Sequence, residues 1–177
     1  MVRLKSGDPL IFGRAGEEIA ALRAAGVAFE VVPGVTAALA AGAALGLPLT
    51  DRQSASKLIF CTGHHANGKD APPLWSGPLP EDATLVIYMP GRDTGRIARE
   101  LATSGVAQDM PCCAISHAAT ERQSVAACRL HAFDKLECGP APVLLLIGRA
   151  MEPLLTSAAI PNRVREIVSQ AAEEAEV

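Results

Sequence analysis

The sequence predicts an α/β fold that begins with a parallel sheet and continues with a mixed one. Over the first 50 residues, short apolar segments alternate with helix-forming segments, which is the pattern of parallel βα units. After residue 110, apolar segments follow one another with little room for helices, as in antiparallel strand pairs. The composition, 49% hydrophobic and 20% charged over 177 residues, is that of folded domains and excludes a disordered chain.

In the first part, a strand over residues 2–5 runs into the turn Ser-Gly-Asp-Pro. A helix is expected over 16–25, with two glutamates in its first turn and a glycine after its end. A strand over 29–32 ends at a Pro-Gly pair, and Thr36 can cap a helix of small residues over 37–45. These elements predict two parallel strands, each followed by a helix.

The polar, proline-containing stretch 48–56 is predicted to be a linker. A helix is expected over 94–103 and a long loop over 63–82. The strands expected after the linker are 57–62, 84–89, 111–116, 123–130 and 143–147. We therefore predict three parts: the remainder of an N-terminal parallel α/β domain (1–50), a C-terminal mixed-sheet domain (51–152), and a helical or disordered tail (153–177).

Several classes of protein are disfavoured. The net charge is −3 and no basic stripe with interleaved aromatics occurs, so we expect no nucleic-acid partner. The longest apolar run is far shorter than the roughly 20 residues that span a bilayer, so no membrane association is expected. The five cysteines form no CxxC pair and no secretory signal precedes them, which favours reduced, buried thiols and a cytoplasmic location.

Two turns are candidate ligand sites, residues 6–9 and residues 33–37. Each follows a predicted parallel strand, and open α/β sheets bind ligands at the carboxyl ends of their strands. Glycine lets the backbone approach a ligand, and exposed amides at a helix start suit a polar group. A plain turn for the first and a simple helix cap for the second remain the alternatives. The presence of two such turns on successive predicted strands strengthens the interpretation of both as ligand sites.

Other candidates are less specific. His64 and His65 follow a predicted strand, but no third ligand at metal-binding spacing accompanies them, so loop histidines are the better interpretation and no metal is expected. Met89 ends a strand and either lines a cleft or belongs to the core. No GxGxxG fingerprint, phosphate-binding loop, GxSxG elbow or HExxH helix occurs, which disfavours the enzyme classes that use them.

The run VRLKSGDPLIFGRAGEE at 2–18, followed by FEVVPGVTAALAAGAALGLPLTDR at 29–52, resembles the tetrapyrrole (corrin/porphyrin) methylase family. Within it, the run resembles the uroporphyrinogen-III C-methyltransferases. The similarity continues through TGH at 62–64, TLVIYM at 84–89 and PAPVLLLIGRA at 140–150. It implies two α/β domains with a cleft between them and a homodimer. The implied activity is methyl transfer from S-adenosylmethionine to C2 and C7 of uroporphyrinogen III, giving precorrin-2 for siroheme or cobalamin synthesis.

The resemblance also implies site residues. Those carried over for S-adenosylmethionine are Ser6, Gly7, Asp8, Ile11, Thr36, Ala37, Met89 and Ala118. Arg14 and Arg52 are candidates for binding the carboxylates of the tetrapyrrole, because a guanidinium pairs with a carboxylate in a bidentate fork. Inter-domain ion pairs are the alternative for both arginines.

The sequence departs from the family in several places. Ser6 stands for a glycine, Pro90 for a glycine, Asp51 for a histidine and Ala44 for a frequent tyrosine. The family's opening strand, its first glycine-rich loop and its acid and base residues have no counterpart. We therefore expect an N-terminally truncated chain with an incomplete first domain, assign no catalytic residue, and expect weak binding of S-adenosylmethionine or none. The alternatives are another tetrapyrrole methylase, such as a precorrin-4 methyltransferase, or an inactive remnant.

Overall fold

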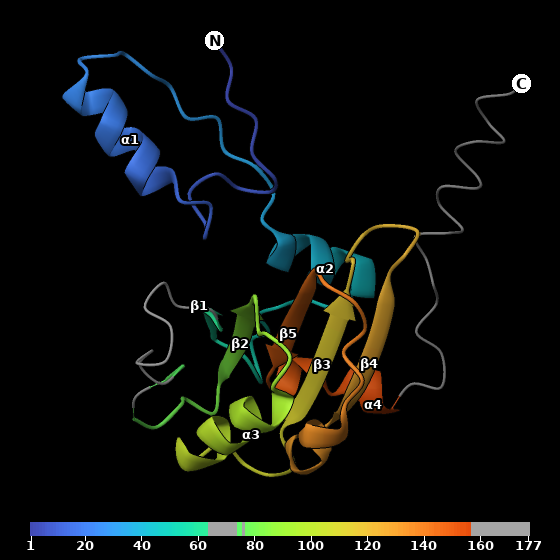
Figure 1. The fold of residues 1–177 in the computed structure, drawn as a ribbon. Coiled ribbons are helices and arrows are strands. Elements are labelled where there is room, and N and C mark those ends of the chain that lie inside the picture. The colour runs from blue at the N-terminus through green and yellow to red at the C-terminus, as the bar shows by residue number, and fades with distance from the viewer. Residues whose placement is uncertain (64–73, 76, 157–177) are drawn as a thin grey trace, which may run out of the picture.

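The fold was described from a computed structural model, in which residues 1–63, 74–75 and 77–156 are placed (Figure 1). The strands are β1 (Lys57–Thr62), β2 (Ala83–Tyr88), β3 (Pro111–Ser116), β4 (Ser124–Arg129) and β5 (Val143–Ile147). The α-helices are α1 (Ala15–Ala24), α2 (Ala37–Leu45), α3 (Thr94–Thr103) and α4 (Pro153–Thr156). Two 3₁₀ helices are η2 (Leu130–Lys135) and η3 (Arg149–Met151).

The strands form one five-stranded mixed sheet in the order β1-β2-β5-β3-β4. β1 and β2 are parallel, whereas β5 runs antiparallel to both β2 and β3. β1, β2 and β3 therefore point the same way, and their carboxyl ends meet at one edge of the sheet. Helix α2 lies at this edge (Figure 1), and the chain after it returns to the other end of the sheet, where β1 begins at Lys57.

Alternating side chains of β2 fill both faces of the sheet, as the two-residue period of a strand requires. Val86 and Tyr88 pack with α2 in one apolar cluster. Leu85 and Ile87 pack with α3 and η2 in a second cluster on the other face. The predicted mixed α/β sheet is thus confirmed, and each of its strands and α3 lies within a residue of the predicted bounds.

The N-terminal part differs from the prediction. Helix α1 is present, one residue earlier than expected, but none of its residues is buried. The strands expected over 2–5 and 29–32 are wrong: neither segment forms a strand or belongs to the sheet. A strand needs a neighbour for its hydrogen-bond ladder, and within the described residues neither segment makes a backbone hydrogen bond that would pair it.

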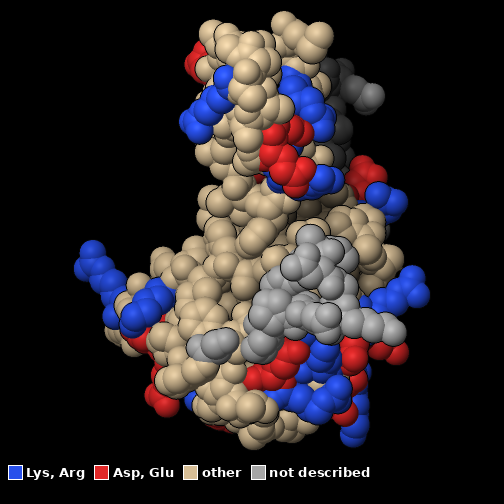
Figure 2. Space-filling view, turned by 60° about the vertical axis from the view of Figure 1, so that its left-hand side comes forward, with Lys and Arg blue, Asp and Glu red and all other residues tan. Residues whose placement is uncertain are grey.

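Apolar side chains are exposed over this part of the chain. Val2 and Leu4 are each 82% exposed and Val32 is 74% exposed. Figure 2 shows this region as a lobe above the wider body that holds the sheet, with charged residues of both signs among uncharged ones. Lys5 connects the first residues of the chain to α1, because its ammonium group donates hydrogen bonds to Glu18 of α1 at 2.9 Å and to the Gly13 carbonyl.

The expected linker is anchored at both ends. Leu49 and Ala55 are buried, and Asp51 and Ala55 form an isolated β-bridge. The Asp51 carboxylate accepts hydrogen bonds from the amides of Gln53 and Ser54 at 2.8 and 2.9 Å. The aspartate that replaces the family's histidine therefore stabilises a tight turn.

Other predictions fall partly outside the described residues. His64 and His65, the middle of the 63–82 loop and the tail beyond Thr156 lie outside them. Within the described part, the predicted tail begins with the short helix α4, and no helix is both long and apolar enough to cross a membrane.

The buried thiols of β3 carry a testable prediction. Cys112 and Cys113 are 0% exposed, and burial raises the pKa of Cys113 to about 12 and raises that of Cys112 as well. Because the thiolate is the reactive form, we expect both to resist iodoacetamide at about pH 8 in the folded protein and to react in denaturant. Peptide mass spectrometry measures this, and rapid native alkylation of either thiol would contradict it.

Candidate functional site

The two candidate turns dock onto each other. The Asp8 carboxylate accepts the Gly34 amide hydrogen bond at 3.0 Å and, through its other oxygen, that of Leu10 at 2.8 Å. A side chain on Gly34 would overlap the carbonyl oxygen of Gly7. Gly7 itself has φ +70°, a conformation that glycine adopts without a steric penalty. Two turns separated by a helix thus form a single backbone surface.

The Asp8 contact is expected to depend on pH. The hydrogen bonds from Gly34 and then Leu10 lower the pKa of Asp8 below its ordinary value of 3.8. Since the folded pKa is depressed, the contact stabilises the docked turns above pH 3.8 and is lost as the pH falls through the lowered value. In an acid titration followed by NMR, the Gly34 amide resonance should move with a midpoint below 3.8. The same titration of D8N should leave it unmoved, and a midpoint above 3.8 would refute the contact.

Thr36 joins the second turn to the sheet. It is the N-cap residue of α2, yet its side chain makes no capping hydrogen bond to the helix. Its hydroxyl instead lies 2.6 Å from the hydroxyl of Tyr88, at the end of β2. The Ala38 amide donates to the same Tyr88 oxygen at 3.1 Å. A side chain from the sheet therefore performs the capping role for α2.

Met89 follows directly and turns the chain away from the sheet. Its side chain is 48% exposed. Its φ of +48° is uncommon for a residue other than glycine, and such backbone conformations are often found at functional sites. Gly63, after β1, packs so tightly here that a side chain on it would lie 2.7 Å from the Pro90 Cα atom. This exposure speaks against the interpretation of Met89 as a core residue, and its place in a cleft stays a prediction.

Ala118 follows β3 at the same sheet edge. It is half-buried and packs against the cluster that holds Ala38 and Tyr88. Its neighbours His117 and Ala119 both have positive φ, +49° and +60°. The His117 ring bonds to the Ser116 hydroxyl at 2.9 Å. This chain of contacts fixes the backbone around Ala118.

The remaining predicted residues are more exposed. Ser6 and Ala37 lie on the surface of the two docked turns, and Ile11 is 36% exposed beside them. Arg14 forms an ion pair with Glu17 at 2.5 Å, and Arg52 lies exposed in the turn between Asp51 and Ala55. The structure thus brings the expected cofactor residues to one sheet edge, whereas neither arginine contacts them through a hydrogen bond among the described residues.

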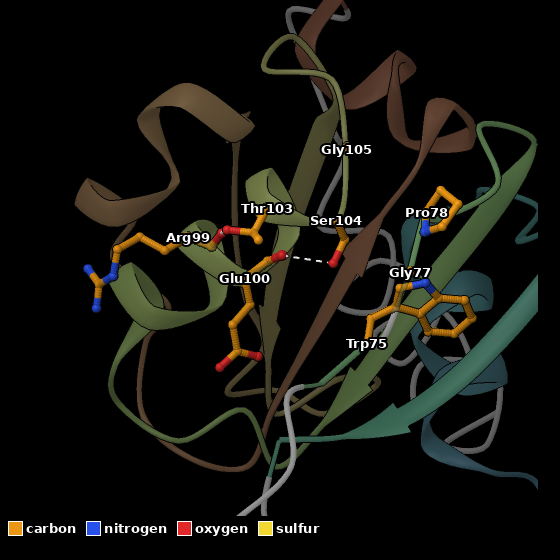
Figure 3. A pocket seen from close by; sticks show the side chains of 8 residues that line it. All are labelled: Trp75, Gly77, Pro78, Arg99, Glu100, Thr103, Ser104 and Gly105. Carbon is orange, nitrogen blue, oxygen red and sulfur yellow. Dashed lines mark hydrogen bonds between the residues drawn. The ribbon is translucent and has the colours of Figure 1, made fainter.

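A pocket of about 560 Å³ lies elsewhere (Figure 3). It is formed by the C-terminal end of α3 and by the loop that carries Trp75, and it contains none of the predicted site residues. Leu74, next to Trp75, belongs to the cluster on the face of the sheet opposite Tyr88. Because ligands of open α/β sheets bind at the carboxyl ends of strands, the edge with the two turns is the stronger candidate.

The chemistry of this edge suits a small polar ligand with an apolar part. The turns offer exposed backbone, and Met89 offers an apolar, polarisable side chain. Thr36 is only 6% exposed, and its hydroxyl bonds to Tyr88. Within the placed part of the chain, no group of three or more His, Cys, Asp or Glu side chains could hold a metal ion. Tyr88 was missed from the sequence, where the run TLVIYM indicates only a buried strand.

A mixed sheet with two docked turns beside the carboxyl end of β2 has the arrangement of α/β proteins whose ligands bind at the carboxyl ends of strands. The chain belongs to the tetrapyrrole (corrin/porphyrin) methylase family, which matches residues 1–134. This establishes the family membership that the sequence motifs indicated, together with the methyltransferase character of that family.

Individual relatives agree with this assignment. The siroheme synthase of Baumannia cicadellinicola subsp. Homalodisca coagulata is 42% identical over 153 residues, 86% of this chain and 33% of that protein. A structure of the uroporphyrin-III C-methyltransferase of Thermus thermophilus is 38% identical with a TM-score of 0.71, covering 84% of this chain and 63% of that one. Another structure of that enzyme, complexed with S-adenosylhomocysteine, is 35% identical with a TM-score of 0.70, covering 86% and 67%.

The chain spans about a third of the length of the curated relatives it matches, since it covers 33% and 31% of the first two siroheme synthases.

Proposed function

We propose that the protein transfers methyl groups from S-adenosylmethionine to C2 and C7 of uroporphyrinogen III, yielding precorrin-2. The observation that carries this proposal is the docking of the turns at 6–9 and 33–37 beside Met89, at the sheet edge where α/β folds bind ligands. The similarity to a methyltransferase that binds S-adenosylhomocysteine supports the choice of ligand.

The residues proposed to hold the methyl donor are Ser6, Gly7, Asp8, Ile11, Thr36, Ala37, Met89 and Ala118. When bound, S-adenosylmethionine supplies a methyl group already activated as a sulfonium. The protein then has to align donor and acceptor carbon, which accounts for much of the rate enhancement in such transfers. Of the two outcomes expected from the sequence, weak binding or none, the assembled turns favour weak binding by this chain.

Arg14 and Arg52 are proposed to hold carboxylates of the tetrapyrrole. Both are exposed, and the Arg14 side chain is 78% exposed although it is paired with Glu17, which supports the proposal. A substrate carboxylate would have to replace Glu17, so the tetrapyrrole is expected to compete with an existing ion pair at this position.

The test is a methyl-transfer assay with S-adenosylmethionine and uroporphyrinogen III, in which the mass of the product is measured by mass spectrometry. The proposal predicts a tetrapyrrole carrying two added methyl groups. Methylation of precorrin-4, with uroporphyrinogen III left unchanged, would favour the other tetrapyrrole methylase. Binding of S-adenosylhomocysteine without transfer to either substrate would favour the inactive remnant.

We also propose a homodimer in the cytoplasm, with residues 1–50 and 51–152 in different domains. The exposed apolar side chains over residues 1–39 support an interface with another polypeptide. The bridged turn at Asp51 and Ala55 supports the domain boundary. Since α2 packs into the cluster of the sheet, it would form the contact between the two domains. Light scattering on the purified protein measures the dimer.

A further inference from the structure

Tyr88 has a role that core packing alone does not require. Its side chain is 8% exposed, and its hydroxyl makes two hydrogen bonds to a segment about 50 residues earlier in the chain. The partners are the Thr36 hydroxyl at 2.6 Å and the Ala38 amide at 3.1 Å. A phenylalanine would fill the same apolar volume but could make neither bond.

The direction of these hydrogen bonds bears on ligand binding. The Ala38 amide can only donate, so it uses an acceptor position of the Tyr88 oxygen. Tyr88 is then free to donate its own proton to the Thr36 oxygen. In this arrangement Tyr88 does not use the Thr36 proton, although Thr36 itself is only 6% exposed, and the three groups form one polarised chain of hydrogen bonds.

Tyr88 also contacts the other parts of the candidate site. Its ring centroid lies 4.9 Å from that of Phe12, which follows the first turn, and 5.7 Å from that of Phe60 in β1. Its carbonyl accepts the Gly63 amide hydrogen bond at 2.7 Å. The next residue is Met89, with φ +48°. One side chain and its adjoining backbone therefore join segments that are far apart in the sequence.

We propose that Tyr88 is a positioning residue whose hydroxyl holds Thr36 and the start of α2 in register with Met89, and so sets the affinity for the adenosyl ligand. This rests on the proposed function, because it presumes that Thr36 and Met89 contact S-adenosylmethionine. Tyr88 acts through these residues, and its effect is expected to appear in ligand affinity more than in folding.

The first test compares Kd for S-adenosylhomocysteine between the wild type and Tyr88→Phe by titration of amide resonances. We expect Y88F to raise Kd about tenfold and to shift the Ala38 amide resonance in the free protein. The matched control is Phe60→Leu, which removes a ring neighbour of Tyr88 and leaves the hydroxyl; its Kd should change less than about twofold. Equal Kd values for Y88F and the wild type would overturn the proposal.

A second test needs no substitution, because the chain contains one tyrosine and one tryptophan. Incorporated 3-fluorotyrosine reports on Tyr88 alone, and its fluorine resonance should shift as S-adenosylhomocysteine is added. Incorporated 5-fluorotryptophan reports on Trp75, in the pocket beside the C-terminal end of α3 (Figure 3), and its resonance should not shift. This measurement decides the question if Y88F does not fold.

The outcomes separate the two proposals. If neither the amide resonances nor the fluorine resonance of the wild-type protein shift when S-adenosylhomocysteine is added, the proposed function is refuted. If the wild type binds the ligand but the fluorine resonance of labelled Tyr88 does not shift, only the positioning role is refuted.

Discussion

Replacing Gly34 by alanine is expected to weaken binding of S-adenosylhomocysteine by at least about tenfold. The added Cβ atom would overlap the Gly7 carbonyl oxygen, so the turns at 6–9 and 33–37 must separate. Backbone atoms cannot yield as the end of a flexible side chain can. Separation also removes the hydrogen bond from the Gly34 amide to Asp8. The ligand titration of G34A against the wild type measures the loss.

Gly16→Ala is the matched control for Gly34→Ala. Gly16 lies in α1, and a Cβ atom there would meet nothing within 4 Å. Alanine is the better helix former by roughly 0.5–1 kcal/mol, so G16A should bind as the wild type does and be no less stable. Unchanged affinity in G34A would show that the docked turns are not the ligand site.

Replacing Phe133 by alanine is expected to lower the free energy of unfolding by about 3–5 kcal/mol, the range for a buried phenylalanine. Phe133 lies in η2 with 0% exposure and packs in the cluster that α3 and β2 share. Its removal leaves a cavity beneath α3 that the surrounding strands cannot fill. Denaturant unfolding of the variant and the wild type gives the difference.

Phe29→Ala provides the comparison for Phe133→Ala. Phe29 is 39% exposed and lies 6.0 Å from the Arg23 guanidinium, a contact worth about 0.5–1 kcal/mol at an exposed site. We therefore expect F29A to lose less than about 1 kcal/mol. A loss in F133A as small as that in F29A would mean that η2 does not belong to the core.

The sequence predicted the sheet of residues 57–147 well because its strands are short, apolar and bounded by glycine or polar turns. Segments 2–5 and 29–32 have the same local pattern, and for them the prediction failed. Apolar, β-branched residues make an extended backbone favourable. Pairing with a neighbouring strand decides whether it becomes a sheet, and pairing is not a local property.

The candidate site, too, could be predicted from the sequence only in part. The turns around Asp8 and Gly34 were predicted because turn residues and a helix start are visible in the local sequence. Their docking through one hydrogen bond between residues 26 positions apart was not visible. Tyr88 was missed because its hydroxyl partners lie 52 and 50 positions away, and a tyrosine in a buried strand is ordinarily read as core.

The central claim is that the docked turns and Met89 form the binding site for S-adenosylmethionine. The most direct measurement is a titration of the ¹⁵N-labelled chain with S-adenosylhomocysteine, followed by amide resonances, because it detects weak binding and locates it. We predict that the shifts concentrate at Gly7, Gly34, Ala37 and Met89. Shifts centred on the pocket around Trp75, or none anywhere, would contradict the claim.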